Sequence, residues 1–144
     1  MRFMLPLLVG LLAAAAPSQP ADPVQKSHID GNLPGPNRFE AYLTRDLQKY
    51  FQERTGHPVR VTHIYLRNGP TQSGVAYPKF YLWVTVAVAN KRLEEGAARI
   101  AAIDQKYFEV THFVGLQQIK ANPNALYDTF PASVAQKILS TMAR

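Results

Sequence analysis

The chain of 144 residues contains no cysteine. Without thiols, neither a disulfide bond nor a thiolate metal ligand can form, and a cysteine nucleophile is excluded. A folded domain must therefore be stabilised by its hydrophobic core. Hydrophobic residues make up 47% of the chain, which is enough for such a core in a domain of about 110 residues.

The sequence also lacks the short motifs that carry common enzyme chemistry. It has no Gly-x-Ser-x-Gly turn, no Gly-rich phosphate loop and no His-Glu-x-x-His pair. Nucleophilic catalysis would need a reactive hydroxyl beside a histidine, and no pattern in the chain places one there. These absences favour a protein that is not an enzyme, and we expect neither a cofactor nor a metal.

Of the four histidines, only His63 and His112 fall within segments expected to be strands. On one face of a sheet, together with Asp104 or Glu109, they could supply metal ligands or a general base. The interpretation that we favour is structural, because no ligand spacing recurs. Each histidine is then partly buried and hydrogen-bonded within the sheet.

Basic residues outnumber acidic ones by 16 to 10, which gives a net charge of +6. They are scattered singly, and Lys91-Arg92 is the only adjacent pair. This spacing argues against a nucleic-acid patch and indicates charge spread over the surface for solubility. Contact with an anionic component of the cell envelope stays an alternative.

Residues 1–21 have the order of a cleavable signal peptide. Basic Arg2 precedes an apolar run over 3–12, and small residues over 13–18 offer two cleavage sites. A spanning helix needs about 20 apolar residues, so an uncleaved anchor is the less favoured alternative. We therefore expect a periplasmic or secreted protein, and the lack of cysteine favours the periplasm.

Prolines follow this leader closely, and residues 17–36 hold five of the eleven in the chain. Together with glycines and polar residues, they predict a flexible linker over 22–36. The remaining residues, 37–144, are expected to form one domain.

That domain should open with a helix, because apolar residues recur at helical spacing from Phe39 to Phe51 and Gly56 follows. Four β-rich runs come next, at 59–67, 79–89, 97–103 and 107–114. Residues 90–96 are expected to form a turn. The alanines of 97–103 also suit a helix, but a hairpin with the following run is favoured.

The last part of the chain is expected to be helical. A short turn is predicted over 116–120, Asn122-Pro123 is typical of a helix start, and Pro131 begins the final segment.

The element order indicates an α+β fold in which the N-terminal helix packs on a four-stranded antiparallel sheet, with a helical segment at the C-terminus. Over residues 37–115 this order resembles that of the cystatin-like folds, and less closely that of the cone-shaped nuclear-transport-factor-two type. The Gln-x-Val-x-Gly loop of inhibitory cystatins is absent. The resemblance therefore does not imply protease inhibition.

Aromatic residues on the strands give one candidate binding face, made of Tyr65, Tyr81 and Trp83. If the final helix covers this face, the aromatics belong to the core, which is the interpretation that we favour. If it does not, an exposed patch of functional size remains.

The function expected from the sequence is a non-catalytic binding or interaction module. Its partner would be a protein or an anionic component of the cell envelope. A further possibility is a structural subunit of an envelope or secretion assembly, which differs only in having a fixed partner. The alternative is a small-ligand-binding protein or enzyme of the cone-shaped type, with a pocket between the helix and the sheet.

Overall fold

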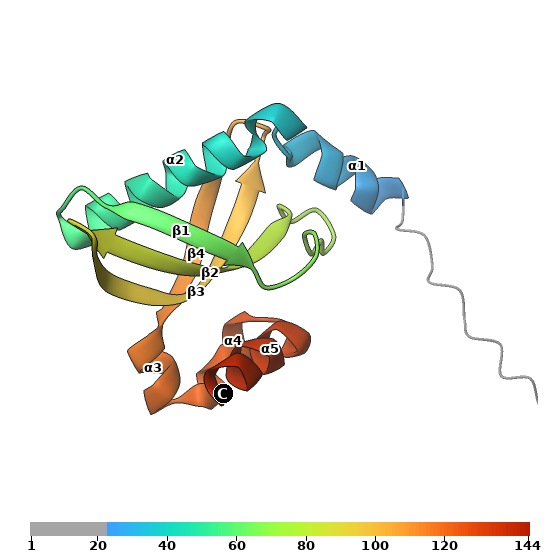
Figure 1. The fold of residues 1–144 in the computed structure, drawn as a ribbon. Helices are drawn as coiled ribbons and strands as arrows, with labels where there is room; N and C mark the ends of the chain where they lie inside the picture. The colour runs from blue at the N-terminus through green and yellow to red at the C-terminus, as the bar shows by residue number, and fades with distance from the viewer. Residues whose placement is uncertain (1–22) are drawn as a thin grey trace, which may run out of the picture.

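The structure, a computed structural model, describes residues 23–144 (Figure 1). The leader predicted over 1–21 lies outside the described residues. The elements are α1 (Pro23–Asn32), α2 (Pro36–Thr55), β1 (Arg60–Tyr65), β2 (Lys79–Val88), β3 (Lys91–Ile103), β4 (Tyr107–Gly115), α3 (Leu116–Ala121), the short 3-10 helix Pro123–Ala125, α4 (Leu126–Thr129) and α5 (Ala132–Met142).

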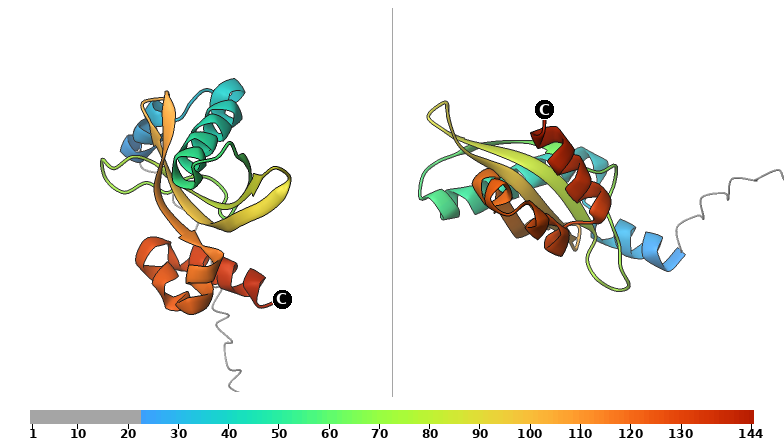
Figure 2. Two further views of the ribbon diagram at one scale, coloured as in Figure 1. Left: turned by 90° about the vertical axis from the view of Figure 1, so that its left-hand side faces the viewer. Right: turned by 90° about the horizontal axis from the view of Figure 1, so that it is seen from below.

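The fold is α+β, as the sequence predicted. The four strands form one antiparallel sheet in the order β1-β2-β3-β4. Helix α2 lies across one face of the sheet, and α3 to α5 lie against the other (Figures 1 and 2). The sheet is thus covered on both faces, and β1 and β4 are its two edges.

One hydrophobic core fills the space between α2 and the sheet. Leu43, Leu47 and Phe51 recur at helical spacing along α2 and are almost fully buried. They pack on alternate residues of β2, among them Leu82 and Val84, whose side chains share one face of the strand. Because these side chains are large and fully buried, the layer between helix and sheet is filled.

A second core lies on the opposite face of the sheet. Val134 and Ile138 of α5 pack there with Phe130, and Tyr81 of β2 is buried against them. The predicted C-terminal helical segment is therefore confirmed. It explains why β2 is apolar on both faces.

Strand β3 is longer than expected. The segment 90–96 was predicted to be a turn, but the turn consists of Ala89 and Asn90, both with positive φ, and β3 begins at Lys91. Two central residues with positive φ match the right-handed twist of the flanking strands. The strand predicted over 97–103 is confirmed as the second half of β3.

The linker prediction did not anticipate a helix, yet α1 occupies most of 22–36. The end of α1 is tied to the turn between β3 and β4, because the Asn32 side chain accepts a hydrogen bond from the backbone N–H of Asp104 at 2.9 Å. The Asn32 carbonyl also accepts one from the backbone N–H of Gln105. These contacts hold in place a segment whose prolines, glycines and polar residues predicted a flexible linker.

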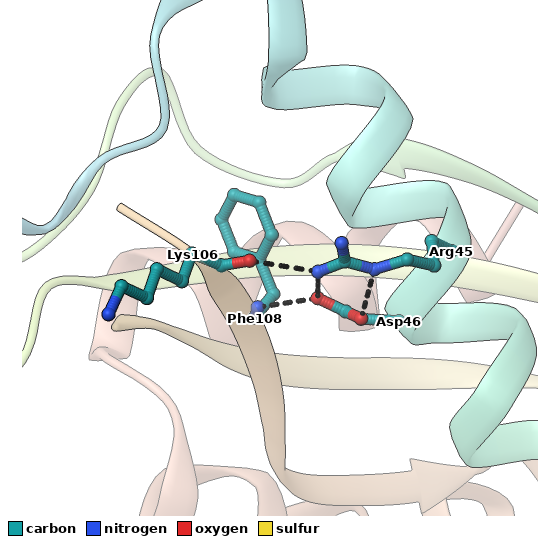
Figure 3. Close-up of polar contacts among 4 residues, drawn as sticks. All are labelled: Arg45, Asp46, Lys106 and Phe108. Carbon is teal, nitrogen blue, oxygen red and sulfur yellow. Dashed lines mark hydrogen bonds and ion pairs between the residues drawn. The ribbon is translucent and has the colours of Figure 1, made fainter. Parts of the chain in front are cut away.

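The start of the β4 edge is covered by α2 (Figure 3). The backbone N–H of Phe108 points away from β3 and donates to the Asp46 carboxylate at 2.7 Å. Arg45 pairs with the same carboxylate and donates to the carbonyl of Lys106. Two side chains of α2 therefore take up backbone groups that would otherwise be open to another strand.

Candidate functional site

A groove of about 460 Å³ lies between the sheet and the C-terminal helices. Its floor is formed by β1 and β2, and its walls by α3 and α5. Apolar side chains dominate it: Ile64, Leu66, Trp83, Leu116, Ile138 and Met142. A volume of this size lies within the range of about 300–1,000 Å³ that is usual for ligand pockets.

Ile64 forms the mouth of the groove at the free side of β1. Its side chain is 62% exposed, although an isoleucine on a strand is usually buried. Trp83 lies next to it on β2, because Ile64 and Trp83 are register partners, and is partly buried. An exposed apolar side chain beside a half-buried tryptophan forms an apolar surface. Covering this surface with an apolar group of a ligand lowers the free energy.

The rim of the groove carries three charged side chains, namely Glu95, Lys120 and Lys137. Glu95 accepts hydrogen bonds from the Trp83 indole at 3.3 Å and from Arg92 at 3.4 Å. Neither lysine pairs with a carboxylate within residues 23–144. Lys120 and Lys137 are therefore available to bind an anionic group of a ligand.

On its other face, β1 carries a polar cluster. The Tyr65 hydroxyl donates to Glu40 of α2 at 2.5 Å, and His63 lies 3.2 Å from the second oxygen of the same carboxylate. Burial, together with the hydrogen bond to Glu40, raises the pKa of the Tyr65 hydroxyl far above its ordinary value. Because its pKa is raised, Tyr65 stays protonated at physiological pH. The cluster joins β1 to α2.

The three aromatics predicted as a binding face do not lie together. Tyr81 is core, packed edge-to-face on Phe130 with its hydroxyl 2.7 Å from Thr71. Trp83 shares that face but lies in the groove, and Tyr65 extends from the opposite face toward Glu40. Of the predicted residues, Trp83 has its ring in the groove, and Tyr65 contributes only at its mouth.

Sequence reasoning missed Ile64, the two lysines and the helical walls. Ile64 belongs to a β-rich run in which every apolar residue looks like core, so nothing local marks it as exposed. Lys120 and Lys137 are distant from β1 in sequence, and no spacing rule brings them together.

The two histidines are also far apart. His63 lies on β1 toward α2, whereas His112 lies on β4 at the other edge of the sheet, paired with Arg99. Arg99 donates to the carbonyl of Thr129 on the face of the C-terminal helices, which places His112 on that face. They cannot share a site, and the part of the chain from 23 to 144 holds no cluster of potential metal ligands.

Another depression, of about 540 Å³, lies near the start of α3 and is lined by charged and amide side chains together with Leu93 and Leu116. Its charges are matched internally, because Arg54 binds Glu94 at 2.9 Å. The charged groups of this depression are therefore less available to a ligand than the lysines of the groove are.

The chain matches no protein-family model, no curated protein and no solved structure. Function is therefore inferred from the chemistry of the groove. Within residues 23–144, no helix is both long enough and apolar enough to cross a membrane.

Proposed function

We propose that this chain is an exported, non-catalytic binding module whose ligand occupies the groove between β1, β2 and α5. The observation that carries the proposal is the pairing of an apolar floor, with Ile64 exposed at its mouth, and two unpaired lysines at its rim. Concave apolar surfaces with a few polar groups at the edge are typical of ligand and partner sites.

The ligand should be amphipathic. Its apolar part would cover Ile64 and Trp83, and an anionic group would lie near Lys120 or Lys137. Each lysine lies on the surface, so its contribution is modest, and apolar contact supplies most of the affinity.

Binding is favoured over catalysis by the groups that line the groove. Its carboxylate, Glu95, is held by the Trp83 indole and by Arg92. One of its hydroxyls, that of Thr141, donates to the backbone carbonyl of Lys137, and no histidine is among the lining residues. The other lining hydroxyl, that of Tyr65, is directed out of the groove toward Glu40 on the opposite face of the sheet. No hydroxyl inside the groove therefore lies beside a base.

The alternative of a cone-shaped ligand-binding protein places the pocket between α2 and the sheet. Leu47, Phe51 and Leu82, each at most 1% exposed, occupy that layer. The filled layer supports a cystatin-like arrangement, with a helix lying on a curved sheet, more than a hollow cone.

Export is proposed from the leader at 1–21 and from the lack of cysteine. Expression of the whole chain in a bacterium, followed by mass spectrometry of the periplasmic fraction, tests it. The expected N-terminus is residue 16 or residue 19, after one of the two small-x-small motifs. An intact N-terminus on cytosolic protein would overturn this part of the proposal.

The groove is tested with anilinonaphthalenesulfonate, a dye that combines aromatic rings with one sulfonate. Trp83 is the only tryptophan in the chain, so its fluorescence reports on the groove directly. We expect saturable quenching of Trp83 with energy transfer to the dye.

A matched pair of variants locates the dye. Ile64→Ser removes an apolar side chain from the mouth, whereas Val75→Ser removes an even more exposed apolar side chain from a loop outside the groove. Loss of about 1 kcal/mol of apolar contact should weaken binding to Ile64→Ser about fivefold. Equal affinity for the two variants would refute the assignment of the site.

A further inference from the structure

The two edges of the sheet differ in how they are protected. At β4, the outward N–H of Phe108 is taken up by Asp46, and the carbonyl of Lys106 by Arg45. Side chains placed over backbone groups in this way oppose the addition of another strand at the start of β4.

At β1 the corresponding groups are free. The hydrogen bond from the Leu66 N–H to the Tyr81 carbonyl, at 2.9 Å, shows which residues face β2. By the alternation of an antiparallel ladder, the backbone groups of Val61, His63 and Tyr65 point away from the sheet. Within residues 23–144, no backbone or side-chain group bonds to them.

The groove opens at this same edge. Ile64 forms its mouth, and the side chains of Thr62 and Ile64 extend to the face on which α5 lies. A strand added beside β1 would lie about 4.8 Å away, with every second side chain on that face. Those side chains would continue the row from Trp83 through Ile64 into the mouth of the groove.

We propose that β1 binds an extended peptide segment of a partner protein as a fifth strand, and that the groove-facing side of this segment carries an apolar residue and an acidic residue two positions apart. This inference rests on the proposed function and names the class of its ligand. Main-chain hydrogen bonds to Val61, His63 and Tyr65 supply affinity, and the groove selects the side chains of the peptide.

The charges around the groove favour an acidic peptide over a second copy of this chain. Lys120 and Lys137 are unpaired, and the nearby Glu95 is already engaged. Strand β1 itself contains Arg60 and no carboxylate. Pairing of two β1 edges would therefore bring no negative charge to the lysines.

The first experiment selects binders from a displayed library of random twelve-residue peptides, with the whole protein immobilised. We expect the enriched peptides to carry an apolar residue and an acidic residue two positions apart and to quench Trp83 fluorescence. Enrichment of basic peptides, or of none, overturns the proposal.

The second experiment measures the affinity of one enriched peptide for paired variants. His63→Pro removes an outward N–H, whereas His63→Ala removes the same side chain but keeps that N–H. We expect at least tenfold weaker binding to His63→Pro and less than threefold to His63→Ala. Lys137→Glu should weaken binding at least tenfold, and Lys49→Glu, with the same change in net charge on α2, less than threefold.

A third measurement does not depend on the folding of any variant. Methylation of alternate backbone nitrogens in the peptide should abolish binding in one register and spare it in the other, because only alternate N–H groups face β1. Equal effects in both registers would overturn strand addition.

The outcomes separate the two proposals. If the dye binds in the groove but no peptide binds at β1, strand addition is wrong and the proposed function stands. A dimer in sedimentation experiments that His63→Pro dissociates would assign the edge to a second copy and refute the peptide. If neither dye nor peptide binds, both proposals fail.

Discussion

Replacement of Asp46 by alanine should destabilise the domain more than its place on a surface helix indicates. The Asp46 side chain is only 12% exposed, and its carboxylate accepts the backbone N–H of Phe108 at 2.7 Å. A hydrogen bond to a charged acceptor contributes about 1.5–3 kcal/mol to stability. Its ion pair with Arg45, which is 50% exposed, adds less than about 1 kcal/mol.

The expected loss for Asp46→Ala is therefore about 2–3 kcal/mol, and urea unfolding followed by circular dichroism measures it. Asp46→Asn keeps a neutral acceptor and should lose about half as much. Arg45→Ala should lose less than about 1 kcal/mol. The reasoning is refuted if Asp46→Ala is no less stable than Arg45→Ala.

The same change opens the β4 edge. An edge strand with free backbone groups is prone to pair with other chains, so Asp46→Ala should also aggregate at lower temperature than Arg45→Ala. Light scattering during a thermal ramp compares the two. Equal onset temperatures would show that the carboxylate does not protect the edge.

Three further predictions concern single positions. Gly96→Ala should strongly destabilise the domain in urea unfolding, because a Cβ there would lie 2.3 Å from a backbone carbonyl oxygen of β4. As a control, Gly31→Ala in α1 should be neutral or slightly stabilising, because a Cβ there would have nothing within 4 Å. Phe51→Ala should cost about 3–5 kcal/mol by the same assay, because its ring is fully buried between α2 and the sheet. The raised pKa of Tyr65 means that its contribution to stability is present below about pH 10 and is lost as the pH rises further. Ultraviolet difference titration of the protein against Tyr65→Phe should find no tyrosinate from this residue near pH 10, and its appearance there would contradict the assignment.

The elements were largely predictable because their signals are local. Apolar spacing along α2 and the long β-rich run of β2 are visible in short windows. The errors have local causes too. The segment 90–96 is polar and resembles a turn, but residues 91–96 pair with β2 and are therefore strand. The prolines near α1 predicted a linker where the structure has a helix.

The candidate site was less predictable. Tyr81 and Trp83 are two residues apart on one face of β2, yet one is buried beneath Phe130 and the other lies in the groove. Strand alternation assigns a face, but it does not say which helix covers which part of that face. The position of α5 decides this.

By itself, the sequence determined that the domain folds around a thiol-free hydrophobic core, that its order is helix, four strands and helices, and that both faces of β2 are apolar. Those properties follow from side-chain chemistry and periodicity over a few residues. Only the tertiary structure decided that Asp46 covers the start of β4 while β1 stays open, and that Ile64 and Lys137 meet at one groove. Such contacts join residues far apart in the chain, and the packing of whole elements, rather than any local preference, selects them.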